Sequence, residues 1–327
     1  RLPVETVLGR DGVGLADCAI AESKFEKGED ISARILSLMP RIHEIQRHGT
    51  PDIEFAAMGL LVRSQVASGR TDDARHTLEL LRARFVQQEQ RRFLPNIDAM
   101  LCRIALQTGN REAAEAWYRE KAPKNPQQLN VMMRYQYLTQ AMAELAAGTP
   151  ERALLTLAPL EPYCRACQRH IDGIHLDVLC AIALYRQGDR LWQQRLTAAL
   201  TAAEEFSFIR TVSVYGNAVL PLLEALSWNK TGKWGLRFMS AVRMQASCCP
   251  AFLQPPLPRG AALTAAELQV LRLICADRSN AEIGAILDIK LPTVKTHVRH
   301  ILTKLGVRRR SEAKTAAQKL RLISEEF

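Results

Sequence analysis

The stretch LDIKLPTVKTHVRHILTKL, residues 287–305, carries two chemically opposite faces at helical spacing. Its apolar residues recur with the period of a helix that buries one face, and they are Val294, Val298, Ile301, Leu302 and Leu305. Cationic and small polar residues fall between them, namely Lys295, Thr296, Arg299, His300 and Thr303. A helix with such a face can enter a DNA major groove and reach base edges and phosphates. An ordinary amphipathic surface helix is the alternative that this pattern leaves open.

Two capping boxes predict further helices before this stretch. Ser279 with Glu282 opens one helix and Thr264 with Glu267 opens another, because in each pair the hydroxyl caps the first turn while the carboxylate reaches back. Residues 288–292 are too few for anything but a tight turn, so a helix-turn-helix is expected. The predicted buried faces are Ile283, Ile286 and Leu287 before the turn, Leu268, Leu271, Ile274 and Cys275 upstream, and Ala313, Ala316, Ala317 and Leu320 in a fourth helix.

Residues at fixed spacing across 263–313 carry a family resemblance. They are Leu263, Thr264, Glu267, Val270, Leu271, Ser279, Asn280, Glu282, Ile283, Leu287, Ile289, Thr293, Val294, Lys295, His297, Ile301, Lys304, Leu305, Val307, Arg310 and Ala313. In this set the domain resembles the LuxR-type helix-turn-helix family. The resemblance implies a four-helix DNA-binding domain whose third helix reads the major groove and whose fourth often supports dimers.

Carried over by position, the resemblance also implies contacts with DNA. It assigns bases to Lys295, Thr296 and Arg299, and phosphates to Thr293, Lys304, Ser279 and Asn280. At the last two, the positive end of a helix dipole would assist. Arg310 is expected to be a structural partner of a carboxylate in the domain rather than a reader.

Three residues depart from the family pattern. Asp277 stands where Gly is usual, Gly284 where Ala is usual, and Lys290 where Ser or Thr is usual. Asp tolerates a left-handed helix end, whereas Gly within a helix and a missing cap each cost about 1 kcal/mol. Since none of the three lies on the predicted reading face, we expect a somewhat soft domain that still recognises DNA.

The composition is that of a globular protein with a basic end. The chain has 327 residues, 47% of them hydrophobic, and a net charge of +10, of which residues 257–327 contribute +6. This asymmetry is typical of a polyanion-binding module attached to a nearly neutral body. The sequence contains neither an apolar run long enough to span a membrane nor a signal peptide, and its eight Cys are scattered, so we expect a cytoplasmic protein with reduced thiols. The first residue is Arg instead of Met, so we expect either a piece of a longer protein or a processed chain.

A repeat of about forty residues organises the chain from Val13 to Gln245. Five glycines mark it, at intervals of 41, 40, 39 and 40 residues: Gly28, Gly69, Gly109, Gly148 and Gly188. Ala follows five positions after the first four, Gln193 takes that place after the fifth, and Gly232 hints at a sixth unit. An apolar helix before each Gly and a second one after it predict an array of helix pairs.

The array resembles tetratricopeptide repeats and the helical sensor domains of MalT-like regulators. Stacked pairs of this kind form a superhelix with a concave surface. We expect that surface to bind a small-molecule or protein effector and to control oligomerisation. Candidate aromatic residues for it are Trp117, Tyr118, Tyr135, Tyr137, Tyr185 and Trp192, although packing between repeats is the commoner role for each.

A Pro-rich segment separates two predicted domains. Four Pro fall within nine residues from Pro250 to Pro258, which excludes helix and predicts an extended linker over 250–262. The predicted domains are a helical-repeat domain over residues 1–249 and a helix-turn-helix domain over 263–327. The fold class is therefore all-α.

Other chemistry is not supported. Cys164, Cys167, His170 and His175 lie too close together in sequence for a zinc finger, so no metal is expected. Residues 230–234, KTGKW, lack the first Gly of a phosphate-binding loop and the Ser or Thr after its Lys. With no catalytic grouping and no cofactor motif, the chain is predicted to be a non-enzyme that needs no cofactor.

The prediction is a bacterial transcription regulator. Its expected partners are double-stranded DNA, RNA polymerase, an unidentified effector on the repeats and a second copy of the chain, with no membrane. An alternative from another class is an interaction scaffold whose helix-turn-helix no longer binds DNA. A response regulator is disfavoured, because its phosphoacceptor domain needs strands alternating with helices.

Overall fold

The computed structural model describes residues 2–29, 32–124, 129–255, 263–305, 307 and 309–319. These residues form α-helices and short 3₁₀ helices and contain no strand, which confirms the all-α class. The chain divides into two units, Arg1–Pro255 and Pro256–Phe327. Within the described ranges, no helix is both long and apolar enough to span a lipid bilayer.

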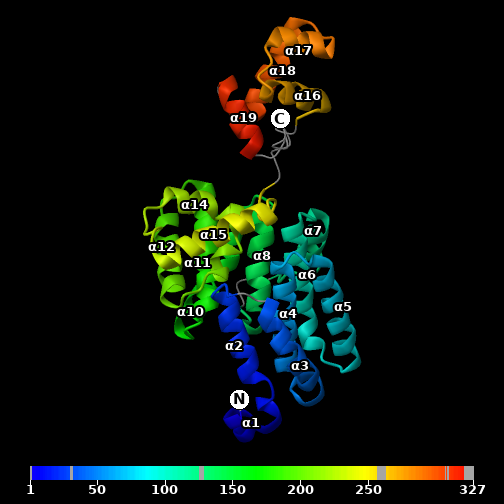
Figure 1. Cartoon of the computed structure of the whole chain (residues 1–327), viewed down its shortest axis with the longest axis vertical. Helices are drawn as coiled ribbons and strands as arrows, with labels where there is room; N and C mark the ends of the chain where they lie inside the picture. The colour runs from blue at the N-terminus through cyan, green and yellow to red at the C-terminus, as the bar shows by residue number, and fades with distance from the viewer. Residues whose placement is uncertain are drawn as a thin grey trace. The chain divides into compact units, whose positions relative to one another are not determined.

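The first unit is a series of short and medium helices (Figure 1). Its elements up to residue 120 are α1 (Leu2–Leu8), η1 (Gly9–Gly12), α2 (Leu15–Glu26), α3 (Ser32–His48), α4 (Pro51–Ala67), α5 (Thr71–Gln87), η2 (Arg91–Phe93), α6 (Leu94–Thr108) and α7 (Arg111–Glu120). The later elements are η3 (Val131–Met133), α8 (Arg134–Ala146), α9 (Pro150–Leu157), α10 (Leu160–Ala166), α11 (His170–Gln187), α12 (Trp192–Glu205), α13 (Arg210–Ser213), η4 (Gly216–Ala218), α14 (Leu220–Ala225) and α15 (Lys233–Cys248).

The five periodic glycines lie between the two helices of successive pairs. These pairs are α2 with α3, α4 with α5, α6 with α7, α8 with α9, and α11 with α12. Each glycine has a positive φ, from 68° at Gly28 to 79° at Gly148. A side chain would be strained there, so glycine lets the chain reverse after the first helix. The forty-residue period therefore corresponds to one helix pair, as predicted.

Small residues pack at the start of the second helices. Ala74, Ala114 and Ala153 are at most 4% exposed, which explains why Ala recurs five positions after the glycine. The predicted sixth unit at Gly232 is wrong. Gly232 has a negative φ of −62° and precedes α15, so it opens a helix instead of ending one.

The two ends of the array meet, which neighbour-to-neighbour stacking alone would not produce. The Ile209 backbone N–H donates to the Glu26 carbonyl oxygen at 2.7 Å, and the Thr211 hydroxyl donates to the Glu26 carboxylate at 2.6 Å. Arg63 of α4 forms an ion pair with the same carboxylate, which is fully buried. The helices thereby surround a cavity of about 720 Å³ within the first unit.

The start of the Pro-rich segment packs onto the first unit. Phe252 and Leu253 are 2% and 0% exposed, and Arg186 donates to the carbonyl oxygen of Leu253. Residues 250–253 form a turn, so the extended conformation predicted from Pro250 onward is wrong there. Burial of two apolar side chains outweighs the extended preference that the prolines impose. Residues 256–262 of the predicted linker lie outside the described residues.

The second unit contains α16 (Ala265–Cys275), α17 (Asn280–Leu287), α18 (Leu291–Lys304) and α19 (Arg310–Lys319). Both predicted capping boxes are confirmed, Thr264 with Glu267 and Ser279 with Glu282. Its core joins all four helices and consists of Val270, Leu271, Ile274, Cys275, Ile283, Val294, Val298, Ile301, Ala313 and Ala317. Ile286 was predicted to be buried but is 55% exposed, and Leu320 lies outside the described residues.

Two of the three departures from the family pattern have a local explanation. Asp277 has a φ of 56°, the left-handed conformation that Asp tolerates. At Gly284, a Cβ atom would lie 2.8 Å from the backbone oxygen of Ile289. Alanine would therefore force the turn before α18 to shift. Replacing Gly284 with alanine would thus not simply regain the helix stability that glycine costs.

Candidate DNA-binding surface

Helix α18 has one buried and one exposed face, as predicted. Val294 and Ile301 are fully buried and Val298 is 9% exposed, all packed in the core of the second unit. Lys295, Thr296 and Arg299 are exposed on the other face. Because they are spaced i, i+1 and i+4, their side chains share one side of the helix. The helix therefore presents two cations and a hydroxyl together.

The exposed side chains of α18 differ in what they offer a nucleic acid. Lys295 supplies a single ammonium, whereas the planar guanidinium of Arg299 can donate two parallel hydrogen bonds to the acceptors of a guanine edge. The Thr296 hydroxyl donates to the Pro292 carbonyl oxygen at 3.1 Å, and the exposed side chain also carries a methyl group. That methyl can contact a thymine. Thr293 is exposed at the start of the same helix.

Lys304, predicted to hold a phosphate, lies in an ion pair within the domain. Its Nζ is 2.7 Å from Glu267 Oε2, and the Glu267 side chain is 4% exposed. His300 Nδ1 lies 4.0 Å from the other carboxylate oxygen. Burial alone would raise the pKa of Glu267, but hydrogen bonds from Lys304 and Thr264 hold it below its usual value. The pair fixes the end of α18 against α16.

We expect Lys304→Ala to destabilise the second unit without changing how its DNA affinity depends on salt. Removal of the ammonium leaves a buried carboxylate with fewer partners, which costs about 1–3 kcal/mol in the free energy of unfolding. Because the pKa of Glu267 is depressed in the folded state, this contribution is present above the unfolded pKa of about 4.3 and is lost as the pH falls through the folded value. Urea unfolding of the variant and of the unaltered chain at pH 7 and at pH 3 measures the loss of stability and its dependence on pH.

Lys290→Ala is the matched control for this variant, because Lys290 is exposed at the start of α18 and should lose little stability. If Lys304→Ala instead keeps its stability and lowers the salt slope of DNA binding by about one unit, Lys304 holds a phosphate as first predicted.

The start of α17 is closed by its own side chains. The Ser279 backbone N–H donates to the Glu282 carboxylate at 2.7 Å, and the Glu282 backbone N–H donates to the Ser279 hydroxyl at 3.3 Å. Hydrogen bonding with Ser279 holds the pKa of Glu282 below its usual value. Arg310 Nη1 donates to Asn280 Oδ1 at 2.7 Å, and Nη2 donates to the Arg278 carbonyl oxygen. Arg310 thus has a structural role, although its partners are an amide and a carbonyl rather than the predicted carboxylate. A phosphate here would meet backbone N–H groups at the start of α17 and the amide nitrogen of Asn280.

The ion pair that Glu267 forms with Lys304 was not predicted from the sequence. The sequence indicated its role in a capping box, but the same carboxylate also orients the last turn of α18 through Lys304. The two residues are 37 positions apart, so local pattern could not join them.

The cysteine and histidine residues between positions 164 and 175 were the other candidate site in the sequence. Within the described ranges, no group of three or more His, Cys, Asp or Glu residues could hold a metal ion. Cys164 is buried with a pKa raised to about 11 by burial, whereas Cys167 is exposed. His175 bonds to Tyr215 instead of facing the pair.

Comparison with known proteins extends the resemblance over most of the chain. Residues 41–229, which cover α4 to α14, match the family described as the MalT-like TPR region. The chain belongs to the MalT-like TPR family. Residues 261–317 match bacterial regulatory proteins of the luxR family, so the second unit is a luxR-type helix-turn-helix domain. These matches place the chain among transcription regulators and not among enzymes.

Two similar proteins align with most of this chain. The HTH-type transcriptional regulator MalT of Klebsiella pneumoniae is 28% identical over 291 residues, and that of Cronobacter sakazakii is 29% identical over 293 residues. Each alignment covers 83% of this chain but 32% of the relative, so the chain spans about a third of the length of the relatives it matches. No solved structure matches the chain.

Proposed function

We propose that this MalT-like chain regulates transcription by placing α18 in the major groove of duplex DNA. The observation that carries the proposal is the shared exposed face of Lys295, Thr296 and Arg299, in a domain of the luxR family. These three side chains contact bases. Thr293 and the start of α17, at Ser279 and Asn280, contact phosphates, while Lys304 holds the helix in position through Glu267.

A DNA titration of the whole chain tests this function. A duplex is first selected by the chain from random sequences, and its affinity is then compared with that of an unselected duplex at several salt concentrations. We expect the affinity to fall with salt and the selected duplex to bind about 10³-fold or more tightly than the unselected one. The alternative, a repeat scaffold with an inert helix-turn-helix, requires no salt-dependent affinity for either duplex.

The first unit is proposed to bind an effector in its cavity. A volume of about 720 Å³ suits a small organic molecule, and the lining joins residues from α2, α4, α6, α8, α11 and α13. Of the aromatic candidates, Trp117, Tyr137 and Trp192 are at most 8% exposed and pack in the core. Tyr135 lines the cavity, whereas Tyr185 is 37% exposed.

A connected set of side chains supports control of DNA binding from the cavity. His175 Nδ1 lies 2.9 Å from the Tyr215 hydroxyl, and the Tyr215 ring stacks on Phe252 with centroids 6.3 Å apart. Both His175 and Phe252 line the cavity, and Phe252 belongs to the turn that ends the described part of the first unit. An effector that moves either side chain would change how the chain leaves the repeats.

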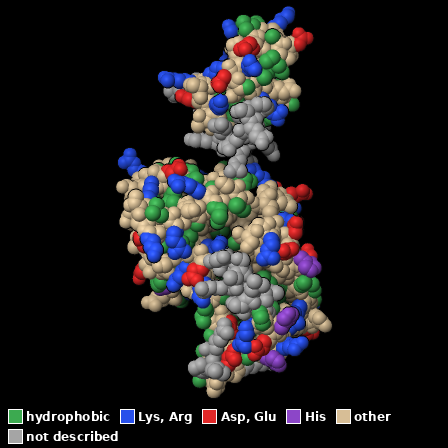
Figure 2. All heavy atoms as spheres, viewed as in Figure 1, with side chains coloured by type: hydrophobic (Ala, Val, Ile, Leu, Met, Phe, Trp, Pro, Cys, Tyr) green, Lys and Arg blue, Asp and Glu red, His purple; other side chains and the backbone are tan. Residues whose placement is uncertain are grey.

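The proposed role in transcription implies further partners. RNA polymerase and a second copy of the chain are the proposed protein partners, and a DNA ligand places the chain in the cytoplasm. On the face drawn in Figure 2, the first unit carries both basic and acidic side chains. That face therefore does not present the uniformly positive surface that attracts DNA.

A further inference from the structure

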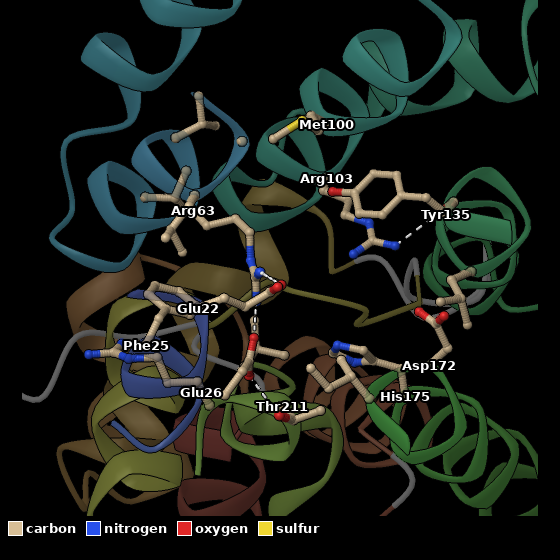
Figure 3. A pocket seen from close by; sticks show the side chains of 18 of the residues that line it. Glu22, Phe25, Glu26, Arg63, Met100, Arg103, Tyr135, Asp172, His175 and Thr211 are labelled. Atoms are coloured by element: carbon tan, nitrogen blue, oxygen red, sulfur yellow. Dashed lines mark hydrogen bonds and ion pairs between the residues drawn. The ribbon is translucent and has the colours of Figure 1, made fainter. Parts of the chain in front are cut away.

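The cavity in the first unit has an excess of positive charge. Among the described residues that line it, five arginines accompany three carboxylates. Arg63 pairs with Glu22 at 3.2 Å and with the buried Glu26 (Figure 3). The third carboxylate, Asp172, is shared by two other arginines, with N–O distances of 3.1 and 3.0 Å. All three carboxylates are therefore already paired.

Arg103 of α6 has no carboxylate within ion-pair distance among the described residues. Its Nε donates to the Thr139 hydroxyl at 2.7 Å and its Nη2 donates to the Tyr135 carbonyl oxygen at 3.2 Å. The guanidinium carbon lies 3.7 Å from the centroid of the Tyr135 ring (Figure 3). A guanidinium has five N–H groups, and one stacked on a ring keeps its edges available. Arg103 thus still offers donors, mainly at Nη1.

The positive charge of Arg103 acts on a neighbouring histidine. Burial first, and then the positive charges of Arg103 and Arg63, lower the pKa of His175 to about 3, so this ring is neutral at physiological pH. A half-buried cation without an anion is costly, because it has lost water without gaining a counter-charge. A bound anion would restore that balance.

The lining of the cavity also has an apolar part. Met100 lies three residues before Arg103 on α6, and so on the same side of the helix, and it also lines the cavity. Phe55, Phe206 and Phe208 line it as well. The cavity therefore joins an unneutralised guanidinium to aromatic and thioether surface.

We propose that the cavity binds a small organic anion, whose carboxylate or phosphate is held by Arg103 and whose apolar body lies against Met100 and the phenylalanine side chains. This inference rests on the proposed effector role of the cavity and names its ligand class. The excess charge makes a neutral ligand the poorer match, since it would leave Arg103 uncompensated.

Calorimetric titration of the whole chain with three probes of one size tests the ligand class. Benzoate supplies a carboxylate, phenyl phosphate supplies a phosphate, and benzamide is the uncharged counterpart of benzoate. We expect at least one anion to bind about 10-fold or more tightly than benzamide, because a hydrogen-bonded charge pair is worth more than a neutral contact. Which of the two anions binds better distinguishes a carboxylate ligand from a phosphate ligand.

Substitutions locate the site. Arg103→Met retains the apolar stem and should weaken the preferred anion about 10-fold or more, with benzamide unchanged, whereas Arg103→Lys should retain part of the affinity. Arg119→Met is the control, because Arg119 is exposed and lies outside the cavity lining. If Arg103→Met unfolds the chain, titration of the lysine variant with the preferred anion and with benzamide decides.

Two results would overturn the proposal. Binding of benzamide as tight as that of both benzoate and phenyl phosphate would mean that the cavity takes a ligand of another class, which leaves its effector role intact. Failure of both anions to bind, or anion binding that survives Arg103→Met, would exclude Arg103 as an anion site. Neither result bears on DNA recognition, which the duplex titration tests separately.

Discussion

Replacing Lys295 and Arg299 together with alanine is expected to abolish the sequence preference of the chain while leaving it folded. Both side chains are exposed on α18, outside the core of the second unit. A good base contact is worth about 1–3 kcal/mol of discrimination, so loss of the two should remove about 2–6 kcal/mol. Affinity for the selected duplex would then approach that for an unselected one. Parallel titrations of both duplexes at one salt concentration measure the effect.

A charge-matched control separates the recognition of bases from the general electrostatic attraction of cations to DNA. Arg272→Ala with Lys290→Ala removes the same number of cations from exposed positions outside the predicted contacts. This variant should bind both duplexes somewhat more weakly but keep the ratio of their affinities. Unaltered discrimination by the Lys295→Ala, Arg299→Ala variant would remove α18 from the role of reader.

The second unit was predictable because its signals are local. Each capping box spans four residues, and the buried positions of α18 recur every three or four residues, so each could be recognised without knowing the fold. The glycine period in the first unit is local in the same sense, since each glycine sets one reversal. These features account for the all-α class, the helix pairs and the exposed face of α18.

Contacts between distant residues could not be predicted in this way. The Glu26–Thr211 hydrogen bond joins residues 185 positions apart, and it closes the array around the cavity. No repeat of forty residues encodes such a closure. Likewise, the Pro-rich composition around Phe252 gave no sign that this ring would be buried against Tyr215. Lys304 was assigned to a phosphate from the family resemblance, because its ion pair with Glu267, which lies in another helix, leaves no local sign in the sequence.

The whole chain is expected to bind its operator much more tightly than residues 257–327 alone when the repeats bring two chains together. The second unit has its own core, which supports its folding alone, but one such domain makes few base contacts. Linking two domains on adjacent half-sites makes the second binding event intramolecular and can raise affinity by about 10² to 10⁴. DNA titration of the short and whole chains, beside light scattering of each, measures affinity and association together.

A ligand in the cavity could change DNA affinity by changing how the repeats associate. The last described residues of the first unit are fixed to it, since Arg186 donates to the Leu253 carbonyl oxygen and Asn217 donates to the Pro250 carbonyl oxygen at 3.2 Å. We therefore expect an effector in the cavity to act through the repeats and their association, because the residues that line the cavity belong to the first unit. Titrations with and without the preferred anion, in this chain and in one extended toward the full length of its relatives, should show association and DNA affinity rising together. Equal affinity of the short, whole and extended chains under every condition would mean that the repeats do not control DNA binding.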